Sequence, residues 1–518
     1  MKSFIIGIDI GGTNTDAVLV DDNQKLIGAV KTATTADICS GFSNTLKKLV
    51  ELTHVNPEDI KAISVGTTHA TNAILQGHGL YNVGVIRIAG QKPDSIPSCF
   101  AWPAPLKKAI YVGTETISGG FDCKGSPITP FNEKETIDAV HRLLEKGAES
   151  FAVIGVFSPM NAEQEKHVAM MIHSICGSHF PVTLSYQVGG IGFIERENTA
   201  ILNSALKKVM AEGFVTLEVA KTQLGYDCPL YITQNNGSLI GLNQAIENPI
   251  LTISAGPTNS FIGARLLAGV RDAIIVDVGG TSTDIGMIKN GYPKRSLNIS
   301  NIGGISLNFS MPDVLSIAIG GGSHIQVDDI HGNVQIGPKS VGKDLLTQAV
   351  CFGGRQLTLT DAALRTGILV VEGALPDRTI LTTPQAEGVL MNAIQTIRRY
   401  VKMMEGNPTD LPVLLVGGGA AMFSRDKLDS RYMIPPYAHV ANAYGSALAE
   451  IVGTADRVIS LQERSVALEK MQQEAISEAI LRGADGNTIQ IVDLEIVPYH
   501  YTPNRMARVI VTASGKRA

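Results

Sequence analysis

Asp9-Ile-Gly-Gly-Thr-Asn-Thr-Asp16 closes the apolar run Phe4-Ile-Ile-Gly-Ile8, and a matching segment, Asp277-Val-Gly-Gly-Thr-Ser-Thr-Asp284, occurs 268 positions further along the chain. Each copy leads into a second apolar stretch, so both predict a strand, a glycine turn and a returning strand. Glycine tolerates positive φ and lets a phosphate approach the backbone closely, and successive backbone N–H groups in such a turn form an anion-binding nest. Two facing hairpins of this kind can hold the two ends of a polyphosphate, which favours a nucleotide-dependent enzyme.

The polar residues of the two hairpins are the first candidate site residues. Asp9 and Asp277 end their strands, where a carboxylate can hold Mg²⁺ through water because this ion keeps much of its hydration shell. We expect both to be catalytic as well. The expected phosphate contacts are Gly11, Gly12, Thr13, Thr15, Gly279, Gly280, Thr281 and Thr283. One such segment is equally well explained as an ordinary hairpin turn, whereas two copies with matched Thr and Asp positions favour the functional interpretation.

A third glycine turn follows the apolar run Val413-Leu-Leu-Val416. Its glycines are candidates to contact adenine and ribose, although a plain strand-to-helix turn explains them too; they are Gly417, Gly418 and Gly419. Ser254-Ala-Gly-Pro-Thr258 precedes a helix of small residues. We interpret this segment either as a further wall of the nucleotide site or as tight helix packing.

Two more segments carry substrate-side candidates. Between a predicted strand and a predicted helix stand Thr67, Thr68, His69 and Asn72. A helix N-terminus favours an anion, so Thr68 and Asn72 are predicted to be catalytic, with helix capping by Thr68 as the alternative. Ser323 and His324 end a run of three glycines; a buried, hydrogen-bonded His is the alternative for His324. The chain contains no H-E-x-x-H, G-x-S-x-G or P-loop motif.

Composition narrows the class of protein. The 518 residues carry a net charge of −5, with pI near 6.1, unlike the basic footprint of a nucleic-acid binder. No apolar run approaches the ~20 residues that span a bilayer, and the start does not resemble a signal peptide. Six cysteines are scattered without a C-x-x-C pair, which fits reduced thiols. We therefore expect a cytoplasmic protein that binds neither nucleic acid nor membrane.

Strands and helices are predicted to alternate, which indicates an α/β architecture. A Pro- and Gly-rich stretch, 90–130, is predicted to be a surface excursion, and a long helix over 194–224 to carry the chain between lobes. We expect a duplicated fold with an interlobe cleft. The predicted divisions are a first lobe, 1–193, a second lobe, 194–455, and a C-terminal helix and strands, 456–518, packing back on the body.

The motifs together resemble the A-type, ATP-using subunits of the hydantoinase/oxoprolinase family, within the acetate kinase–actin–sugar kinase superfamily. The matching stretches, in chain order, are Gly7–Asp16, Val65–Ile74, Ser254–Pro257, Asp277–Asp284, Ile319–Ser323 and Thr358–Ala362. The chain departs from the family pattern in being shorter, in the stretch after Ser340, and at Leu315. These departures lie on the expected substrate side, whereas the hairpins match fully.

This resemblance implies a two-lobed, ribonuclease H-like fold of the actin and sugar kinase type, which uses ATP and Mg²⁺. It implies a cyclic-amide hydrolase of the hydantoinase/5-oxoprolinase type that activates the amide by phosphoryl transfer, acts with a second, B-type subunit, and is compatible with a homo-oligomer. One alternative is a sugar or small-carboxylate kinase, which would need a catalytic Asp outside the hairpins. Another is an actin-like, nucleotide-gated activator of a partner protein.

Overall fold

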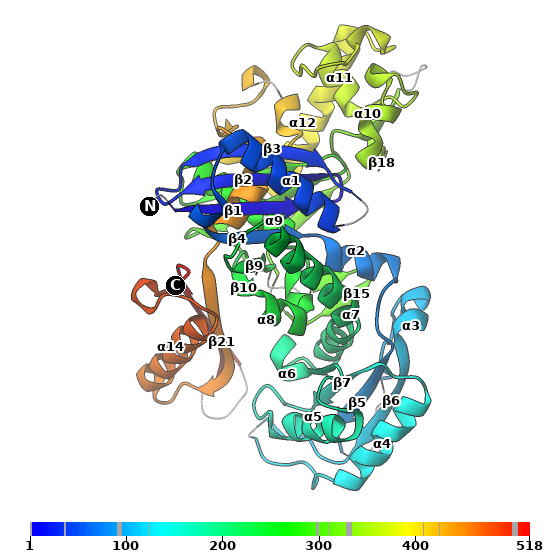
Figure 1. Cartoon of the computed structure of the whole chain (residues 1–518), viewed down its shortest axis with the longest axis vertical. Coiled ribbons are helices and arrows are strands. Elements are labelled where there is room, and N and C mark those ends of the chain that lie inside the picture. Colours follow the sequence, from blue (N-terminus) through cyan, green and yellow to red (C-terminus); the bar gives the residue numbers. More distant parts are fainter. Residues whose placement is uncertain are drawn as a thin grey trace.

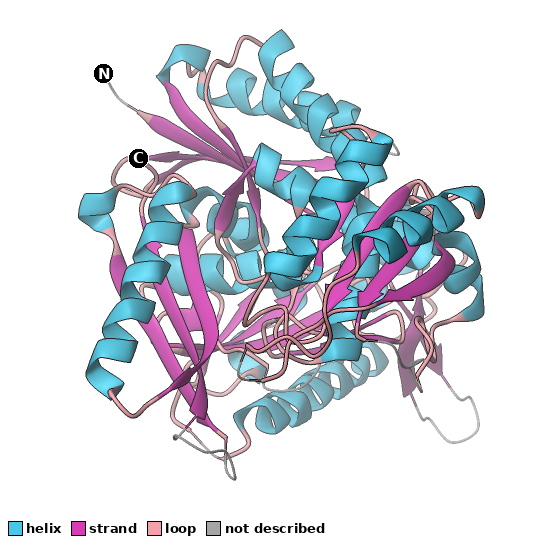
Figure 2. Cartoon of the chain, turned by 90° about the horizontal axis from the view of Figure 1, so that it is seen from below, coloured by secondary structure: helices cyan, strands magenta, loops and turns pink. Residues whose placement is uncertain are grey.

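The computed structural model describes residues 3–35, 38–90, 96–123, 125–296, 300–309, 311–327, 334–407, 409–423, 425–499 and 506–518. Among these residues, strands and helices alternate along most of the chain and form three larger sheets flanked by helices (Figures 1 and 2). The α/β duplicated architecture predicted from the sequence is confirmed.

The largest sheet has nine strands and contains the first hairpin. β1 (Phe4–Ile10) and β2 (Asn14–Asp21) run antiparallel, and β4 (Ile60–Thr67) lies parallel to β1 on its other side. The strand order is β22-β23-β21-β10-β9-β4-β1-β2-β3. Its other strands are β3 (Leu26–Ala33), β9 (Leu230–Thr233), β10 (Leu239–Gly241), β21 (Ile451–Ser460), β22 (Gln490–Pro498) and β23 (Met506–Gly515).

The second sheet repeats the central arrangement of the first. β11 (Ala273–Val278) and β12 (Thr283–Lys289) form the second hairpin, and β19 (Val413–Val416) lies parallel to β11. In each sheet, therefore, a hairpin is followed by a parallel strand whose carboxyl end lies beside the first aspartate of the motif. The remaining strands are β13 (Tyr292–Pro293), β16 (Val314–Ile317) and β20 (Tyr432–Met433).

Two helices of small residues connect these sheets. α9 (Ala255–Ala268) and α13 (Ala441–Leu448) contact each other, and between them they contact strands of both sheets. A Cβ built on Gly263 would lie 1.8 Å from the Ala441 carbonyl oxygen, and one on Gly445 1.9 Å from that of Asn259. The helices thus meet backbone to backbone. The predicted tight packing of the small-residue helix is confirmed.

A four-stranded parallel sheet, inserted between β4 and the long helix α7 (Phe193–Gln223), lies at one end of the molecule (Figure 1). It consists of β5 (Val83–Ile88), β6 (Tyr111–Ile117), β7 (Ser150–Gly155) and β8 (Val182–Leu184), with α3 (Ala104–Ile110), α4 (Glu133–Glu145) and α5 (Glu163–Cys176). The prediction of a surface excursion over 90–130 is wrong for α3 and β6, and 91–95 and 124 lie outside the described residues. Tyr111-Val-Gly-Thr-Glu-Thr-Ile117 shows no regular alternation of apolar and polar residues, and most of the strand is half-buried, so no period of two indicated a strand there.

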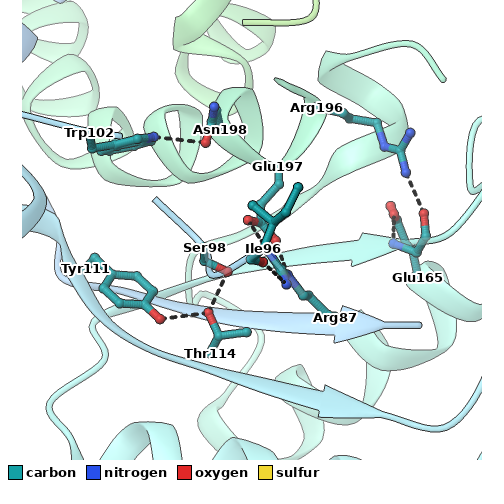
Figure 3. Close-up of polar contacts among 11 residues, drawn as sticks. Arg87, Ile96, Ser98, Trp102, Tyr111, Thr114, Glu165, Arg196, Glu197 and Asn198 are labelled. Atoms are coloured by element: carbon teal, nitrogen blue, oxygen red, sulfur yellow. Dashed lines mark hydrogen bonds and ion pairs between the residues drawn. The ribbon is translucent and has the colours of Figure 1, made fainter. Parts of the chain in front are cut away.

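A buried ion pair and several buried hydrogen bonds fix the start of α7 to the inserted sheet and its neighbouring loops (Figure 3). Arg87 on β5 and Glu197 pair at 2.5 Å, with side chains 2% and 1% exposed. Arg196 donates to the carbonyl oxygens of Gly155 and Gly190, and Trp102 Nε1 donates to Asn198 Oδ1 at 2.9 Å. Because charges so deeply buried must be paired, these contacts set the position of α7.

The domain boundary expected at residue 193 stays a prediction. β9 and β10 follow this residue in the chain but belong to the first sheet, because α7 leads the chain back to that sheet. The other helices are α1 (Ile38–Thr53), α2 (His69–Gln76), α6 (Ser185–Val188), α8 (Leu242–Glu247), α10 (Leu345–Gln348), α11 (Leu359–Arg365), α12 (Thr383–Glu405) and α14 (Arg464–Leu481). Two small hairpins contain β14 (Ser300–Ile302), β15 (Ile305–Leu307), β17 (Ser323–Val327) and β18 (Val334–Ser340). No helix of the described residues is long and apolar enough to cross a membrane.

Candidate functional site

The two glycine turns have the same backbone geometry and meet. Gly11 N–H donates to the Asn14 carbonyl oxygen at 3.0 Å, and Gly279 N–H donates to the Ser282 carbonyl oxygen at 2.9 Å. A Cβ built on Gly280 would lie 3.7 Å from Thr13 Oγ1. The predicted juxtaposition of the two turns is therefore present.

Each hairpin brings its two motif aspartates opposite each other. Asp9 faces Asp16 across the first hairpin, and Asp277 faces Asp284 across the second. Directly opposed like charges are unfavourable in a sheet. Burial raises the pKa of all four carboxyls, and the pKa of Asp277 reaches about 6. Repulsion from Asp16 and Asp277 adds to the raised pKa of Asp9.

The carboxylates of the first hairpin keep unused acceptor atoms. Asn442 Nδ2 donates to Asp9 Oδ2 at 2.9 Å, and Lys31 Nζ pairs with Asp16 Oδ2 at 2.7 Å. The other oxygens, Asp9 Oδ1 and Asp16 Oδ1, are buried and have no partner among the described residues. A buried unpaired carboxylate oxygen is costly, so this arrangement suits a ligand that brings positive charge.

Magnesium fits these residues. Oxygen donors with excess negative charge are what Mg²⁺ requires, and it commonly takes one or two carboxylates while keeping several waters. Within the described ranges, no group of three or more His, Cys, Asp or Glu forms a compact metal cluster. The donor set of Asp9 and Asp277 accordingly matches a hydrated ion carried with a phosphate ligand.

The threonines of the hairpins fall into two kinds. Thr13 is half-buried and Thr281 is exposed, so both hydroxyls remain accessible to a ligand. Thr15 and Thr283, in contrast, are 0% exposed. The Thr15 hydroxyl bonds to that of Thr34, and Thr283 Oγ1 donates to the Ile319 carbonyl oxygen at 2.6 Å. The expectation that Thr15 and Thr283 contact phosphate therefore does not fit, because their side chains point into the fold.

The run of three glycines supports the second turn. Gly321 N–H donates to the Gly279 carbonyl oxygen at 3.0 Å, and Gly322 N–H to that of Gly280 at 2.7 Å. Ser323 is fully buried and accepts from Gly320 N–H at 2.8 Å. The substrate-side placement of Ser323 therefore does not fit, because its hydroxyl closes this loop.

A helix cap lies behind that loop. Thr358 and Asp361 form a capping box at the start of α11, and Thr360 donates to the Gly321 carbonyl oxygen from both its N–H (2.9 Å) and its hydroxyl (2.8 Å). His324 is half-buried, and its backbone forms an isolated antiparallel β-bridge with that of Thr358. Two of the stretches that carry the family resemblance thus form successive layers under the second glycine turn.

The third glycine turn also packs on the second hairpin. A Cβ built on Gly417, which has φ of 84°, would lie 2.2 Å from Asp277 Oδ1. Gly419 N–H donates to the Val278 carbonyl oxygen at 2.8 Å. Gly418 is exposed and has no atom within 4 Å of a built Cβ. The turn is therefore crowded at Gly417, beside Asp277, and open at Gly418, and its contact with adenine and ribose stays a prediction.

The predicted substrate-side residues of α2 follow the first hairpin. Thr67 pairs with Ile10, and its buried hydroxyl accepts from His69 N–H at 3.1 Å. Thr68 makes no side-chain cap, which removes the capping alternative, and Asn72 Nδ2 donates to its hydroxyl at 3.4 Å. Burial lowers the pKa of His69, and its ring lies 3.6 Å from a Cβ built on Gly213 of α7. Thr68 thus lies beside the end of β1, where its N–H donates to the Ile10 carbonyl oxygen at 3.4 Å, Asn72 contacts Thr68, and His69 faces α7.

Sequence reasoning missed four site residues. Ser260 on α9 hydrogen-bonds Asp277 and opposes the rise of its pKa, and Asn259 Nδ2 donates to Thr233 Oγ1 at 2.9 Å. Asn442 and Lys31 contact Asp9 and Asp16, as given above. Asn442 is distant in the chain, so no local motif reveals it. The small-residue character of α9 was the available signal for Ser260 and Asn259.

Two models of one family match this chain. The hydantoinase/oxoprolinase N-terminal region covers residues 5–176, and the hydantoinase/oxoprolinase model covers residues 196–380, together more than half of the sequence. The chain belongs to the hydantoinase/oxoprolinase family. Within this family, it is 26% identical to the acetophenone carboxylase gamma subunit of Aromatoleum aromaticum over 86% of the chain and 68% of that protein.

Another relative is the alpha subunit of the caprolactamase of Pseudomonas jessenii, 25% identical over 92% of the chain and 76% of that protein. The crystal structure of the ATP-dependent caprolactamase from Pseudomonas jessenii superposes with a TM-score of 0.77 at 20% identity. It covers 98% of this chain and 87% of the other. The fold is therefore shared along almost the whole chain.

Proposed function

We propose that this chain binds Mg–ATP between its two glycine turns and uses it to activate a cyclic amide for hydrolysis. The single observation that carries the proposal is the meeting of the two matched turns, with 3.7 Å between Thr13 Oγ1 and a Cβ built on Gly280. Similarity to an ATP-dependent caprolactamase supports the same class. The proposed phosphate contacts are the backbone N–H groups of the two turns with Thr13 and Thr281.

The proposed chemistry overcomes the stability of an unactivated amide. The amide oxygen attacks the γ-phosphorus, the bond to the bridging oxygen breaks, and ADP leaves. Water adds to the activated carbon, the C–N bond breaks, and the ring nitrogen takes a proton. The products of that step are an amine and an acyl phosphate. A second water releases phosphate and leaves the carboxylate. We place the first step on this chain and the later ones on it or on a B-type partner subunit.

The residues of this chain act mainly by position and charge, as phosphoryl transfer requires. Asp9 and Asp277 would hold magnesium, which when bound neutralises phosphate charge. Lys31 offsets the charge of Asp16 at 2.7 Å and would do the same for a transferred phosphoryl group. Thr68 and Asn72 would stand on the substrate side of the first turn.

The test is ATP hydrolysis by the purified chain with Mg²⁺, alone and with the B-type subunit, against a panel of cyclic amides, ketones with bicarbonate, and sugars. Amide-stimulated release of phosphate is the expected result. Bicarbonate-dependent turnover with a ketone would instead place the chain with carboxylases, a class to which the acetophenone carboxylase relative points. A stable sugar phosphate would indicate a kinase. ATP binding without turnover under any condition would favour the nucleotide-gated activator.

A further inference from the structure

A cavity of about 390 Å³ lies at the open end of the second hairpin, away from its glycine turn. β12 begins beside the turn at Thr283 and ends at Lys289, and the cavity is lined by residues that follow this strand, Asn290 and Tyr292 among them. The length of β12 separates the two ends of the hairpin by about 20 Å. The cavity is therefore distinct from the proposed nucleotide site, and its size is at the small end of the range for ligand pockets.

The cavity combines an apolar wall with an excess of positive charge. Its walls come from α9, from the second sheet and from β21 of the first sheet. Leu266 and Leu448 are half-buried members of the apolar wall. The charged residues among the described lining are two cations and one acid, Arg265, Arg271 and Glu450.

Arg265, near the end of α9, has a guanidinium group without a protein partner. Its Nε is buried and accepts no hydrogen-bond partner, and it forms no ion pair with any carboxylate among the described residues. Its Nη1 lies 3.8 Å from a Cβ built on Gly291, so the group reaches the wall that follows β12. Burial lowers the pKa of Arg265, and nearby acidic groups, including Glu450, oppose this only in part. The protein thus leaves this charge incompletely compensated, which is costly.

The acid of the lining is held by neutral groups instead. Glu450 Oε2 accepts from Ser514 Oγ at 2.5 Å and from Tyr292 Oη at 3.4 Å. Arg271 is exposed and adds a second cation to the lining. A guanidinium group presents a planar fork of donors that matches the two oxygens of a carboxylate. An oxyanion would therefore supply the partner that Arg265 lacks.

The apolar wall distinguishes between kinds of oxyanion. Leu266 and Leu448 leave part of their hydrocarbon surface uncovered in the cavity. A short hydrocarbon chain would remove this surface from water, which is favourable. Inorganic phosphate has no such chain and would leave the wall as it is.

We propose that this cavity binds a small organic carboxylate, with Arg265 pairing with the carboxylate and the apolar wall covering the chain. The inference does not depend on the proposed function, because the cavity and the glycine turns are separate. Binding can therefore be measured without ATP.

The test is calorimetric titration of the full chain with acetate, butyrate, inorganic phosphate and butyramide, the uncharged amide of butyrate. Butyrate should bind about tenfold more tightly than acetate, since its two further CH₂ groups cover apolar surface. Butyramide should bind at least about tenfold more weakly than butyrate, and Arg265→Gln should weaken butyrate binding by at least about the same factor, because a charge-assisted pair is lost. Arg398→Gln is the matched control and should leave butyrate binding unchanged. Arg398 is also half-buried with an unpartnered Nε, but it pairs with Asp429 at 3.6 Å and does not line the cavity.

Thermal unfolding separates a binding role from a structural one. Without ligand, Arg265→Gln should be at least as stable as wild type, because an unpaired charge is removed from a partly buried position. Saturating butyrate should raise the unfolding midpoint of wild type and not that of Arg265→Gln. A variant less stable than Arg398→Gln would show that Arg265 supports the fold, and the proposal would be wrong.

Other outcomes would also contradict the site. These are equal binding of butyrate and butyramide, unchanged butyrate binding in Arg265→Gln, and no butyrate binding by wild type. Binding of phosphate without butyrate would mean an inorganic anion site in place of the proposed one. If Arg265→Gln does not fold, Arg271→Gln, at an exposed position, should weaken butyrate binding about threefold, and no change there would count against the proposal.

Discussion

The two glycine turns share a motif and a backbone geometry, yet their supports differ. The first turn is held by Thr34, the residue that follows β3. Its N–H donates to the Thr13 carbonyl oxygen at 3.0 Å, and its Oγ1 donates to the Gly11 carbonyl oxygen at 2.8 Å. The second rests on the glycine loop at Gly321, which in turn rests on Thr360 at the cap of α11. Duplication thus preserved the turn and left its support free to diverge.

The electrostatic surroundings of the two hairpins differ too. In the first, an amine offsets the paired carboxylates, because Lys31 lies 2.7 Å from Asp16. In the second, hydroxyl groups oppose the rise in pKa, Ser260 at Asp277 and Ser316 at Asp284, and the charge of Lys31 also lowers the pKa of Asp277. A motif that occurs twice therefore need not give two equivalent sites.

The largest effect should come from removing either strand-end carboxylate. Asp9→Asn and Asp277→Asn should each lower amide-stimulated ATP turnover about 10³-fold, because electrostatic stabilisation supplies most of phosphoryl transfer. Asp9 is 7% exposed, so the isosteric Asn is the right probe, and circular dichroism should show an intact fold. Turnover within tenfold of wild type in one variant would mean that this hairpin does not serve the reaction.

The next effect concerns the close approach of the third glycine turn to Asp277. A Cβ on Gly417 would lie 2.2 Å from Asp277 Oδ1, at φ of 84°, whereas one on Gly418 meets nothing within 4 Å. Gly417→Ala should cost about 2–4 kcal/mol of unfolding free energy, from overpacking and left-handed strain. Gly418→Ala, the matched control, should cost less than about 1 kcal/mol. Urea unfolding measures both, and equal losses would contradict the described contact.

Sequence periodicity located the elements of this comparison well. The helix expected over 194–224 is α7 (Phe193–Gln223), and both hairpins occur where their glycines predicted. Local sequence patterns failed to predict site residues whose position depends on contacts with distant parts of the chain. Asn442 reaches Asp9 across 433 residues. Thr15 and Thr283 are buried because consecutive residues of β2 and β12 are covered on both faces of their sheets, which a search for hydroxyl donors ignores.

Stability against pH should distinguish the second hairpin from a neutral turn. The pKa of Asp277 rises from 3.8 to about 6 on folding, so the folded state binds the proton more tightly than the unfolded one. The carboxyl group of Asp277 therefore does not lower the unfolding free energy below pH ~4, where it is protonated in both states. As the pH rises, ionisation lowers the unfolding free energy by an amount that reaches at most about 3 kcal/mol above pH ~6. Asp277→Asn should stabilise the protein by about 1–3 kcal/mol at pH 7.5, and this gain should disappear near pH 4. Thermal unfolding measures this difference, and a stability gain of Asp277→Asn that did not change with pH would come from packing instead. Mg–ATP should stabilise wild type more than the variant.

The smallest effects should come from the threonines, which divide each hairpin into an open and a buried side. Thr13→Val and Thr281→Val should raise KM for Mg–ATP about five- to tenfold, the value of about one hydrogen bond, and leave stability nearly unchanged. Thr283→Val should do the reverse and lower the unfolding free energy by about 1–3 kcal/mol, because the Ile319 carbonyl oxygen loses its donor at 2.6 Å. The matched variant Thr15→Val should behave likewise but more weakly, since its partner Thr34 can donate elsewhere, to Gly11 at 2.8 Å. Steady-state kinetics gives KM for Mg–ATP and urea unfolding gives the stability of all four variants. A raised KM in Thr15→Val and Thr283→Val alone would mean that these threonines, and not Thr13 and Thr281, face the ligand.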